Sequence, residues 1–222
     1  WDAIVNGSLM GDWALVRRGA AEIGLELSSI EGPIEEHWEM CHVTFLDADG
    51  VERTHVARRT GPATARIASV AHPEAEQHYD DTVVFEPLPL DPVPEDPGEA
   101  DETPRRYRAL LTIEDAGYRS FLLEGVWPDE EQWVALRSGI YEAGHAVWAY
   151  DGGADELADG TEVECLFACV ALSPAREAHE LHSLLEALTA GWPHKPSWPE
   201  LAEASGEDGD SHRRRYSELW SG

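Results

Sequence analysis

Positive charge is scarce in this sequence of 222 residues. Lys and Arg together number 16, and Lys195 is the single lysine, whereas 44 residues are Asp or Glu. The formal net charge at pH 7 is therefore −28. A surface of this sign repels nucleic acids, phosphates and anionic membranes, and it attracts cations and basic proteins. We therefore expect neither a direct nucleic-acid ligand nor a membrane partner.

Cysteines and long apolar runs are also scarce. Cys41, Cys165 and Cys169 form an odd set without the spacing of a secreted disulfide framework. Cys165 and Cys169 fall four residues apart in a strand-like run, about 13 Å along a regular strand, which is too far for a disulfide. No stretch approaches the roughly 18 apolar residues of a membrane span, and no signal peptide is visible. We expect reduced thiols and a cytoplasmic location.

The motifs of common catalytic sites are absent as well. The sequence contains no G-x-S-x-G nucleophile elbow, no Walker loop and no G-x-G-x-x-G turn. Adjacent carboxylates occur throughout so acidic a chain, and they carry no information about acid–base catalysis. The sequence therefore favours a non-enzymatic protein, with no cofactor and no metal expected.

The acidity is divided evenly along the chain. Residues 1–86 and residues 105–192 each carry 16 acids and 6 bases, whereas residues 87–104 carry six prolines, six acids and no base. A disordered acidic tail would concentrate the charge and lack aromatic residues. We therefore expect an α+β segment over 1–86, a linker or one long loop over 87–104, an α+β segment over 105–192, and a tryptophan-containing extension over 193–222.

Two origins of the acidity are compatible with the composition. Adaptation to high salt raises the content of Asp and Glu and removes lysine, and a GC-rich genome also favours Arg over Lys. Selection for contact with a basic partner would leave the same composition. Charge arguments bear on solubility and on the steering of partners, and they do not identify a partner.

Hydrophobic periodicity predicts an α+β fold with antiparallel sheets and helices on one face. In the first half, the expected elements are a helix over about 8–27 with Ser8 as its N-cap, a hairpin of 37–46 and 51–60 around the turn Asp47-Ala48-Asp49-Gly50, a short helix from Pro62, and a strand over 82–87.

The second half predicts a ferredoxin-like ββαββα order. Its expected elements are a hairpin of 106–113 and 117–126, a helix over 128–143 that opens with Pro at its first position, strands over 145–150 and 161–172 with a turn at 151–153 between them, and a helix from Pro174.

Histidine gathers in one part of the sequence. His37, His42, His55, His72 and His78 fall within 42 residues, beside Glu39 and Cys41. This set offers ligands for zinc and supports an alternative hypothesis, a metal-dependent enzyme that uses the His37–His78 cluster. No pair has zinc-finger spacing, however, so structural or surface roles are favoured.

Two further patterns of charged residues are weaker still. His179 and His182 form H-x-x-H rather than the H-E-x-x-H of a zincin, and they indicate a solvated helix face. The basic run Arg213-Arg214-Arg215 is expected to pair with the protein's own acids.

Aromatic residues are the remaining candidates for a binding surface. Trp192, Trp198 and Trp220 follow the last predicted helix, and Trp148 and Tyr150 lie in a predicted strand. Tryptophan is enriched at the hot spots of protein interfaces. We take these five as candidate partner-binding residues, with the alternative that the indoles cover an edge of the core.

The second half also resembles a known family. Val170-Ala171-Leu172-Ser173-Pro174 forms a strand-to-helix joint, and Leu181, Leu184, Leu185 and Leu188 follow on the helix. These motifs, which with their flanking elements span about a third of the chain, resemble the ribonuclease E inhibitor family known as regulator of ribonuclease activity B. The Tyr-Asp-Gly-Trp ending of that family is reduced here to Gly191-Trp192. The resemblance implies a small, acidic, ferredoxin-like protein that binds an enzyme without catalysis.

Together these observations predict an acidic interaction protein. It would present an acidic face with aromatic anchors to a basic protein, such as a nuclease or a toxin, as its inhibitor, immunity protein or regulator. The alternatives are the metal-dependent enzyme and a salt-adapted protein of unrelated function.

Overall fold

The computed structural model describes residues 1–46, 50–92 and 104–221, and the chain divides into two compact units. The first consists of Trp1–Ser69 and Tyr79–Ala116, and the second of Val70–His78 and Gly117–Gly222. The described residues form six helices and two sheets, so the predicted α+β class is confirmed. The predicted turn residues 47–49 and most of the acidic segment, residues 93–103, lie outside the described part.

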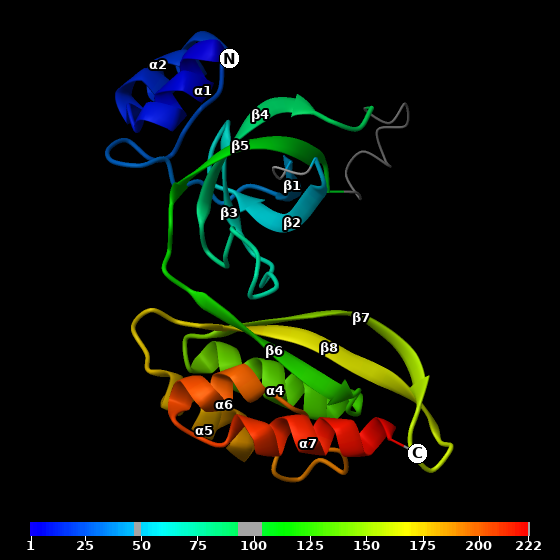
Figure 1. Ribbon diagram of the computed structural model, residues 1–222. Helices are drawn as coiled ribbons and strands as arrows, with labels where there is room; N and C mark the ends of the chain where they lie inside the picture. Colours follow the sequence, from blue (N-terminus) through cyan, green and yellow to red (C-terminus); the bar gives the residue numbers. More distant parts are fainter. Residues whose placement is uncertain (47–49, 93–103, 222) are drawn as a thin grey trace. The chain divides into compact units, whose positions relative to one another are not determined.

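A small closed barrel forms the body of the first unit (Figure 1). Neighbouring strands pair antiparallel, and β1 closes the barrel by pairing parallel with β5, for example Val43 with Tyr107. The expectation of purely antiparallel sheets therefore fails at this one pair. The strands are β1 (Met40–Leu46), β2 (Glu52–Arg59), β3 (Thr64–Ile67), β4 (Thr82–Pro89) and β5 (Arg106–Glu114).

Alternate positions of these strands point into the barrel. Its core combines small side chains with Phe85 and Tyr107, whose ring centroids lie 4.7 Å apart. Cys41 is buried there, and burial raises the pKa of its thiol to about 12 although Arg59 opposes the shift. The three cysteines of the chain carry free thiols, as expected.

Arg59 covers this core. Its guanidinium carbon lies 5.0 Å from the ring centre of Trp38, 5.5 Å from that of Tyr107 and 5.6 Å from that of Phe85. Its Nη1 pairs with a carboxylate oxygen of Glu39 at 2.5 Å, and 15% of the Arg59 side chain is exposed. A planar cation that stacks on aromatic rings while it pairs with a carboxylate uses both properties of arginine.

Two helices replace the single helix predicted over residues 8–27. α1 (Asp2–Met10) ends at Gly11 with φ 68°, and α2 (Trp13–Glu22) begins after Asp12, whose carboxylate accepts the Leu15 N–H at 2.9 Å. The left-handed conformation of Gly11 breaks the helix although the apolar stripe continues through it. Ser8 lies buried inside α1, so the predicted N-cap is wrong.

The short helix predicted from Pro62 is also wrong, because β3 forms there. Ala65 and Ile67 point into the barrel core, while the backbone of β3 pairs with β2 on one side and with β4 on the other. The backbone groups of β2 and β4 can pair with this four-residue segment on both sides. This pairing outweighs the local preference of the segment for a helix.

The segment of residues 87–104 connects neighbouring strands. β4 ends at Pro89 and β5 begins at Arg106, and both strands belong to the barrel. The two strands that flank this segment therefore lie in the same compact unit. The chain passes to the second unit between Ala116 and Gly117.

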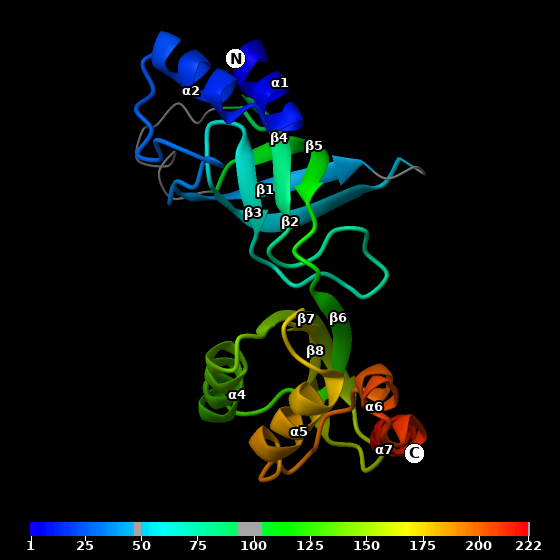
Figure 2. The ribbon, with the colours of Figure 1, turned by 90° about the vertical axis from the view of Figure 1, so that its left-hand side faces the viewer.

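The second unit contains a three-stranded antiparallel sheet in the order β6-β8-β7. Helices cover one face of this sheet (Figure 2). Its elements are β6 (Arg119–Val126), α4 (Glu130–Glu142), β7 (Ala146–Glu156), β8 (Glu162–Leu172), α5 (Ala178–Leu188), α6 (Pro199–Ser205) and α7 (Gly209–Trp220).

The hairpin predicted for 106–113 and 117–126 does not form. β5 pairs with β1 and β4 of the barrel, whereas β6 pairs with β8. The order in the second unit is therefore β-α-β-β-α, followed by two further helices. Because β5 pairs with β1 and β4 to close the barrel, it does not pair with β6, although only a short connection separates β5 from β6.

Local signals set the helices of this unit. Asp129 and Gln132 form a capping box at the start of α4, as the run after Pro128 suggested. Glu177 and Glu180 form a second capping box, so α5 starts at Ala178 rather than at Pro174. Leu181 and Leu185 of α5 pack into the core. Among the described residues, no helix is both long and apolar enough to cross a membrane.

The segment around Ser197 and α6 packs into this core. The backbones of Ser197 and Glu124 exchange two hydrogen bonds, of 2.7 and 2.9 Å, along the outer edge of β6. Trp198, Leu201 and Ala202 then bury their side chains completely. The free edge of the sheet within the described residues is therefore β7.

Substitution of Arg59 tests its contribution to the stability of the barrel. We expect Arg59→Lys to lower the free energy of unfolding by about 2 kcal/mol, because an ammonium keeps the charge but loses the planar stacking on three rings. Urea titration followed by circular dichroism measures the change. Arg58→Lys, at the exposed neighbouring position, is the control and should stay within about 0.5 kcal/mol of the wild type. Equal midpoints for the two variants would contradict the assigned role.

Candidate functional site

The five histidines of the predicted cluster are divided between the two units. His37, His42 and His55 belong to the first unit, and His72 and His78 to the second. His55 is buried in the barrel wall, where its ring centroid lies 6.0 Å from that of Phe45. Among the described residues, these histidines do not form a group with metal-ligand spacing.

The candidate aromatic residues also separate. Trp198 is fully buried and Trp192 is 8% exposed, so both indoles belong to the core, as the alternative interpretation held. Trp148 and Tyr150 lie on the sheet face opposite to the core residue Val147, and the Tyr150 hydroxyl donates to the Val70 carbonyl at 2.6 Å. Trp148 and Trp220 are half-buried.

A polar cluster surrounds the buried Trp198. His182 and Glu186 lie one turn apart on α5, and His212 comes from α7. One ligand atom from each of the three lies within 4.8 Å of the others. These side chains line a cavity of about 520 Å³ together with Lys195 and Arg215. His182 is half-buried, so the solvated face predicted for the H-x-x-H pair holds for His179 alone.

Charge and burial shape this cluster. Lys195 forms an ion pair with Glu186. Burial alone would raise the pKa of Glu186, but the hydrogen bond from Lys195 lowers it below its ordinary value. Burial lowers the pKa of His212 to about 4, and the nearby Arg215 and His182 act in the same direction. At neutral pH, His212 is therefore a neutral imidazole.

The three ligand atoms do not fit a metal ion in this arrangement. The Trp198 backbone N–H donates to Nδ1 of His212 at 3.3 Å, and Arg215 Nη2 donates to the same atom at 2.9 Å. A neutral imidazole that accepts at Nδ1 carries its proton on Nε2 and has no further lone pair for a metal. Lys195 holds Glu186, and Arg215 adds a second positive charge. The cluster ties α5 to α7 and to the chain before α6.

The pH dependence of stability tests this cluster. His212 has a pKa of about 4 when folded and about 6.5 when unfolded, so the unfolded chain binds the proton first as the pH falls. We expect a loss of roughly 3 kcal/mol between pH 6.5 and pH 4 that is absent in His212→Asn, whose amide oxygen can accept from Trp198 without titrating. Urea unfolding across this pH range measures both proteins. Carboxylate titration is common to the two, and parallel curves would contradict the assignment.

The β7–β8 hairpin carries an exposed acidic surface without a basic residue. Residues 151–164 include six acids and no base. Both strands are mostly exposed here, from Tyr150 to Glu156 on β7 and at Glu162 and Glu164 on β8. In the connection between them, hydrogen bonds from Thr161 lower the pKa of Asp159, which stays ionised at neutral pH.

A bulge replaces the turn that was predicted at residues 151–153. Asp151 pairs with Leu166 and Ala154 with Glu164, so Gly152 and Gly153 together face one residue of β8. A Cβ on Gly152 would lie 2.3 Å from the Cys165 carbonyl oxygen, and Gly153 has φ 69°. The two glycines therefore let β7 bend and continue to Glu156, and the true turn follows residue 156.

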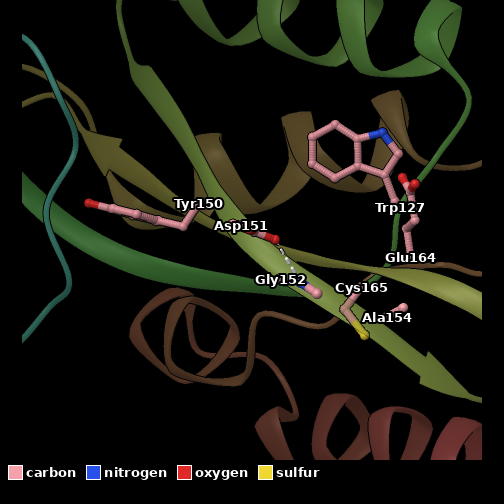
Figure 3. A pocket seen from close by; sticks show the side chains of 8 residues that line it. Trp127, Tyr150, Asp151, Gly152, Ala154, Glu164 and Cys165 are labelled. Atoms are coloured by element: carbon pink, nitrogen blue, oxygen red, sulfur yellow. Dashed lines mark hydrogen bonds between the residues drawn. The ribbon is translucent and has the colours of Figure 1, made fainter.

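This bulge borders a second cavity, of about 360 Å³. Trp127, Tyr150, Asp151, Glu164 and Cys165 line it with the two glycines and Ala154 (Figure 3). The Asp151 carboxylate accepts the Gly153 N–H at 3.0 Å. Trp127 and Glu164 line the same cavity, and in Figure 3 the Tyr150 side chain points away from both. We refer to this site as the bulge pocket.

Contacts of Trp127 fix the position of its indole in the bulge pocket. The Trp127 ring packs against Trp133 of α4 with 5.0 Å between centroids, and the Trp127 backbone N–H donates to the Glu164 carbonyl at 2.8 Å. The pocket therefore combines an anchored indole with two carboxylates. Of its lining residues, Tyr150 was predicted from the sequence as a partner contact. The base-free acidic run around Asp-Gly-Gly was the signal that could have indicated the rest.

No protein-family model matches this chain, and no curated protein matches it. One solved structure, described as "Novel crystal structure of a hypothetical protein from Neisseria gonorrhoeae", is similar to it at 12% sequence identity with a TM-score of 0.33. The similarity covers 73% of this chain and 94% of that chain. A similarity at this level carries no argument about fold or function.

Proposed function

We propose that this protein acts without catalysis and binds a basic protein through its acidic surface, as an inhibitor, immunity protein or regulator of a partner such as a nuclease or a toxin. The observation that carries the proposal is the use of the few positive charges. Most carboxylates have no cation to pair with, since 44 acids share 16 bases, and several bases already serve internal contacts.

Internal ion pairs neutralise much of the basic content. Among the described residues, six basic side chains pair with carboxylates of the same chain: Arg59, Arg66, Arg106, Arg176, Lys195 and Arg213. Arg17 and Arg215 also donate to backbone carbonyls. The surface that faces solvent is therefore more uniformly acidic than the composition alone indicates, and a field of this kind steers a basic partner toward it.

The β7–β8 hairpin is the part of this surface best suited to contact. It is exposed along both strands and carries six acids without a base. Its strand β7 is also an edge of the sheet. Like charges on an edge strand prevent pairing between identical molecules. The same charges favour the approach of a strand or loop with basic side chains.

The strand order of the second unit is compatible with the proposed ferredoxin-like fold. The β-α-β-β-α order with strands arranged β6-β8-β7 is that of a ferredoxin-like fold without its last strand. The Glu124–Ser197 bridge lies on the edge of β6 where that strand would pair. A ferredoxin-like second unit related to the ribonuclease E inhibitors belongs to this proposal, as does a cytoplasmic location.

Affinity capture tests the proposed function. With the protein as bait in a lysate of its own cells at low ionic strength, we expect one basic protein in stoichiometric amount, whose activity falls when it is bound. A hairpin variant with Asp155→Asn, Glu156→Gln and Glu162→Gln should bind the purified partner about tenfold more weakly, because it removes three charges at the contact. Calorimetric titration measures the affinity.

The matched control removes three charges elsewhere. Glu130→Gln, Glu131→Gln and Glu142→Gln lie on exposed positions of α4 and change the net charge equally. We expect this variant to bind within about threefold of the wild type, since charges away from the contact act mainly through the screened long-range field. Capture of no basic protein would contradict the function, and equal losses in both variants would contradict the choice of surface.

A further inference from the structure

The bulge pocket has the composition of an arginine site that lacks its arginine. None of the residues that line it is basic, and within the described chain neither Asp151 nor Glu164 forms an ion pair. Two carboxylates and an indole therefore line one cavity, which is large enough to admit a side chain, without a compensating cation.

The chain itself shows how such a combination is completed. At the barrel, Arg59 stacks on Trp38, Phe85 and Tyr107 and pairs with Glu39 at 2.5 Å. That site consists of a tryptophan, a carboxylate and the arginine between them. At the bulge pocket, Trp127 and Glu164 supply the first two parts, and Asp151 adds a second carboxylate.

The chemistry of the lining side chains favours a planar cation over a compact one. Two carboxylates from neighbouring strands can accept separate N–H groups of one guanidinium, while its flat face lies against an indole. An ammonium can use the charges and the indole, but it lacks the flat fork that joins them. Trp127 is already held by Trp133, so little conformational freedom of the indole would be lost on binding.

We propose that the bulge pocket, formed by Trp127, Asp151, Glu164 and the Gly152-Gly153 backbone, binds an arginine side chain of the basic partner. This inference rests on the proposed function for the source of the arginine. The pocket would place one anchoring contact at the centre of the acidic hairpin, and the surrounding acids would supply attraction at longer range.

Short blocked peptides test the pocket directly. We would titrate the ¹⁵N-labelled protein at low ionic strength with acetyl-Gly-Arg-Gly-amide and with the citrulline peptide, which has the same shape but no charge. The arginine peptide should shift the Gly152 and Gly153 amide signals and the Trp127 indole signal, and the citrulline peptide should not. The lysine peptide should bind at least about threefold more weakly than the arginine peptide.

Two variants and one control separate the pocket from general acidity. Glu164→Gln and Trp127→Leu should each weaken the arginine peptide about fivefold or more. Glu142→Gln removes the same charge at an exposed position of α4, outside the pocket lining, and should weaken it less than twofold. Unchanged amide spectra away from the pocket would verify that each variant folds. Equal effects of Glu164→Gln and Glu142→Gln would overturn the pocket.

The two proposals can fail separately. If the captured basic partner binds the wild type, Glu164→Gln and Trp127→Leu equally well, the arginine pocket is wrong and the proposed function stands. If no basic partner is captured while the arginine peptide still shifts the pocket signals, the pocket stands and the proposed function is wrong.

Discussion

Repulsion among unpaired carboxylates is the constraint on which the rest of this structure depends. With 44 acids and 16 bases, each positive charge has several possible partners, and its placement is therefore informative. The guanidinium groups of Arg59 and Arg215 lie over aromatic rings at the edges of the two cores, Tyr107 and Trp198 respectively. The single lysine joins the cluster that holds the last helices. The hairpin of residues 151–164 receives no positive charge at all.

This distribution connects stability with recognition. A carboxylate beside a cation of its own chain contributes to the fold, whereas a carboxylate without one adds to the field that a partner meets. Glu39 and Glu164 illustrate the difference, since both lie near a tryptophan and the first alone has an arginine. The acidic hairpin is thus the place where the chain leaves its negative charge available. In the polar cluster around His212, by contrast, Lys195 and Arg215 of the same chain supply the positive charges.

Local pattern predicted the elements whose partners are close in sequence. The hairpin of β1 and β2 and the helix α4 followed from alternation and from the capping residues after Pro128. The hairpin expected across residues 114–116 does not form, because β5 pairs instead with β1, which lies some sixty residues earlier in the chain. His182 was expected on a solvated face because nothing in residues 193–222 indicated that α7 would bring His212 against it. The bulge pocket required knowledge that Gly152 approaches the Cys165 carbonyl, and no local pattern contains that contact.

Salt screens both the attraction between two oppositely charged proteins and the repulsion among the carboxylates of one protein. A surface selected for a basic partner should therefore bind that partner more weakly as salt rises, whereas a surface adapted to high salt should become more stable. The most direct measurement is therefore the affinity for the captured basic partner between 50 and 300 mM NaCl, with the melting temperature of the free protein followed up to 2 M. Our account predicts that affinity falls by about tenfold or more across the first range while the melting temperature changes little. An affinity that does not depend on salt, together with a melting temperature that climbs steadily to 2 M, would contradict it.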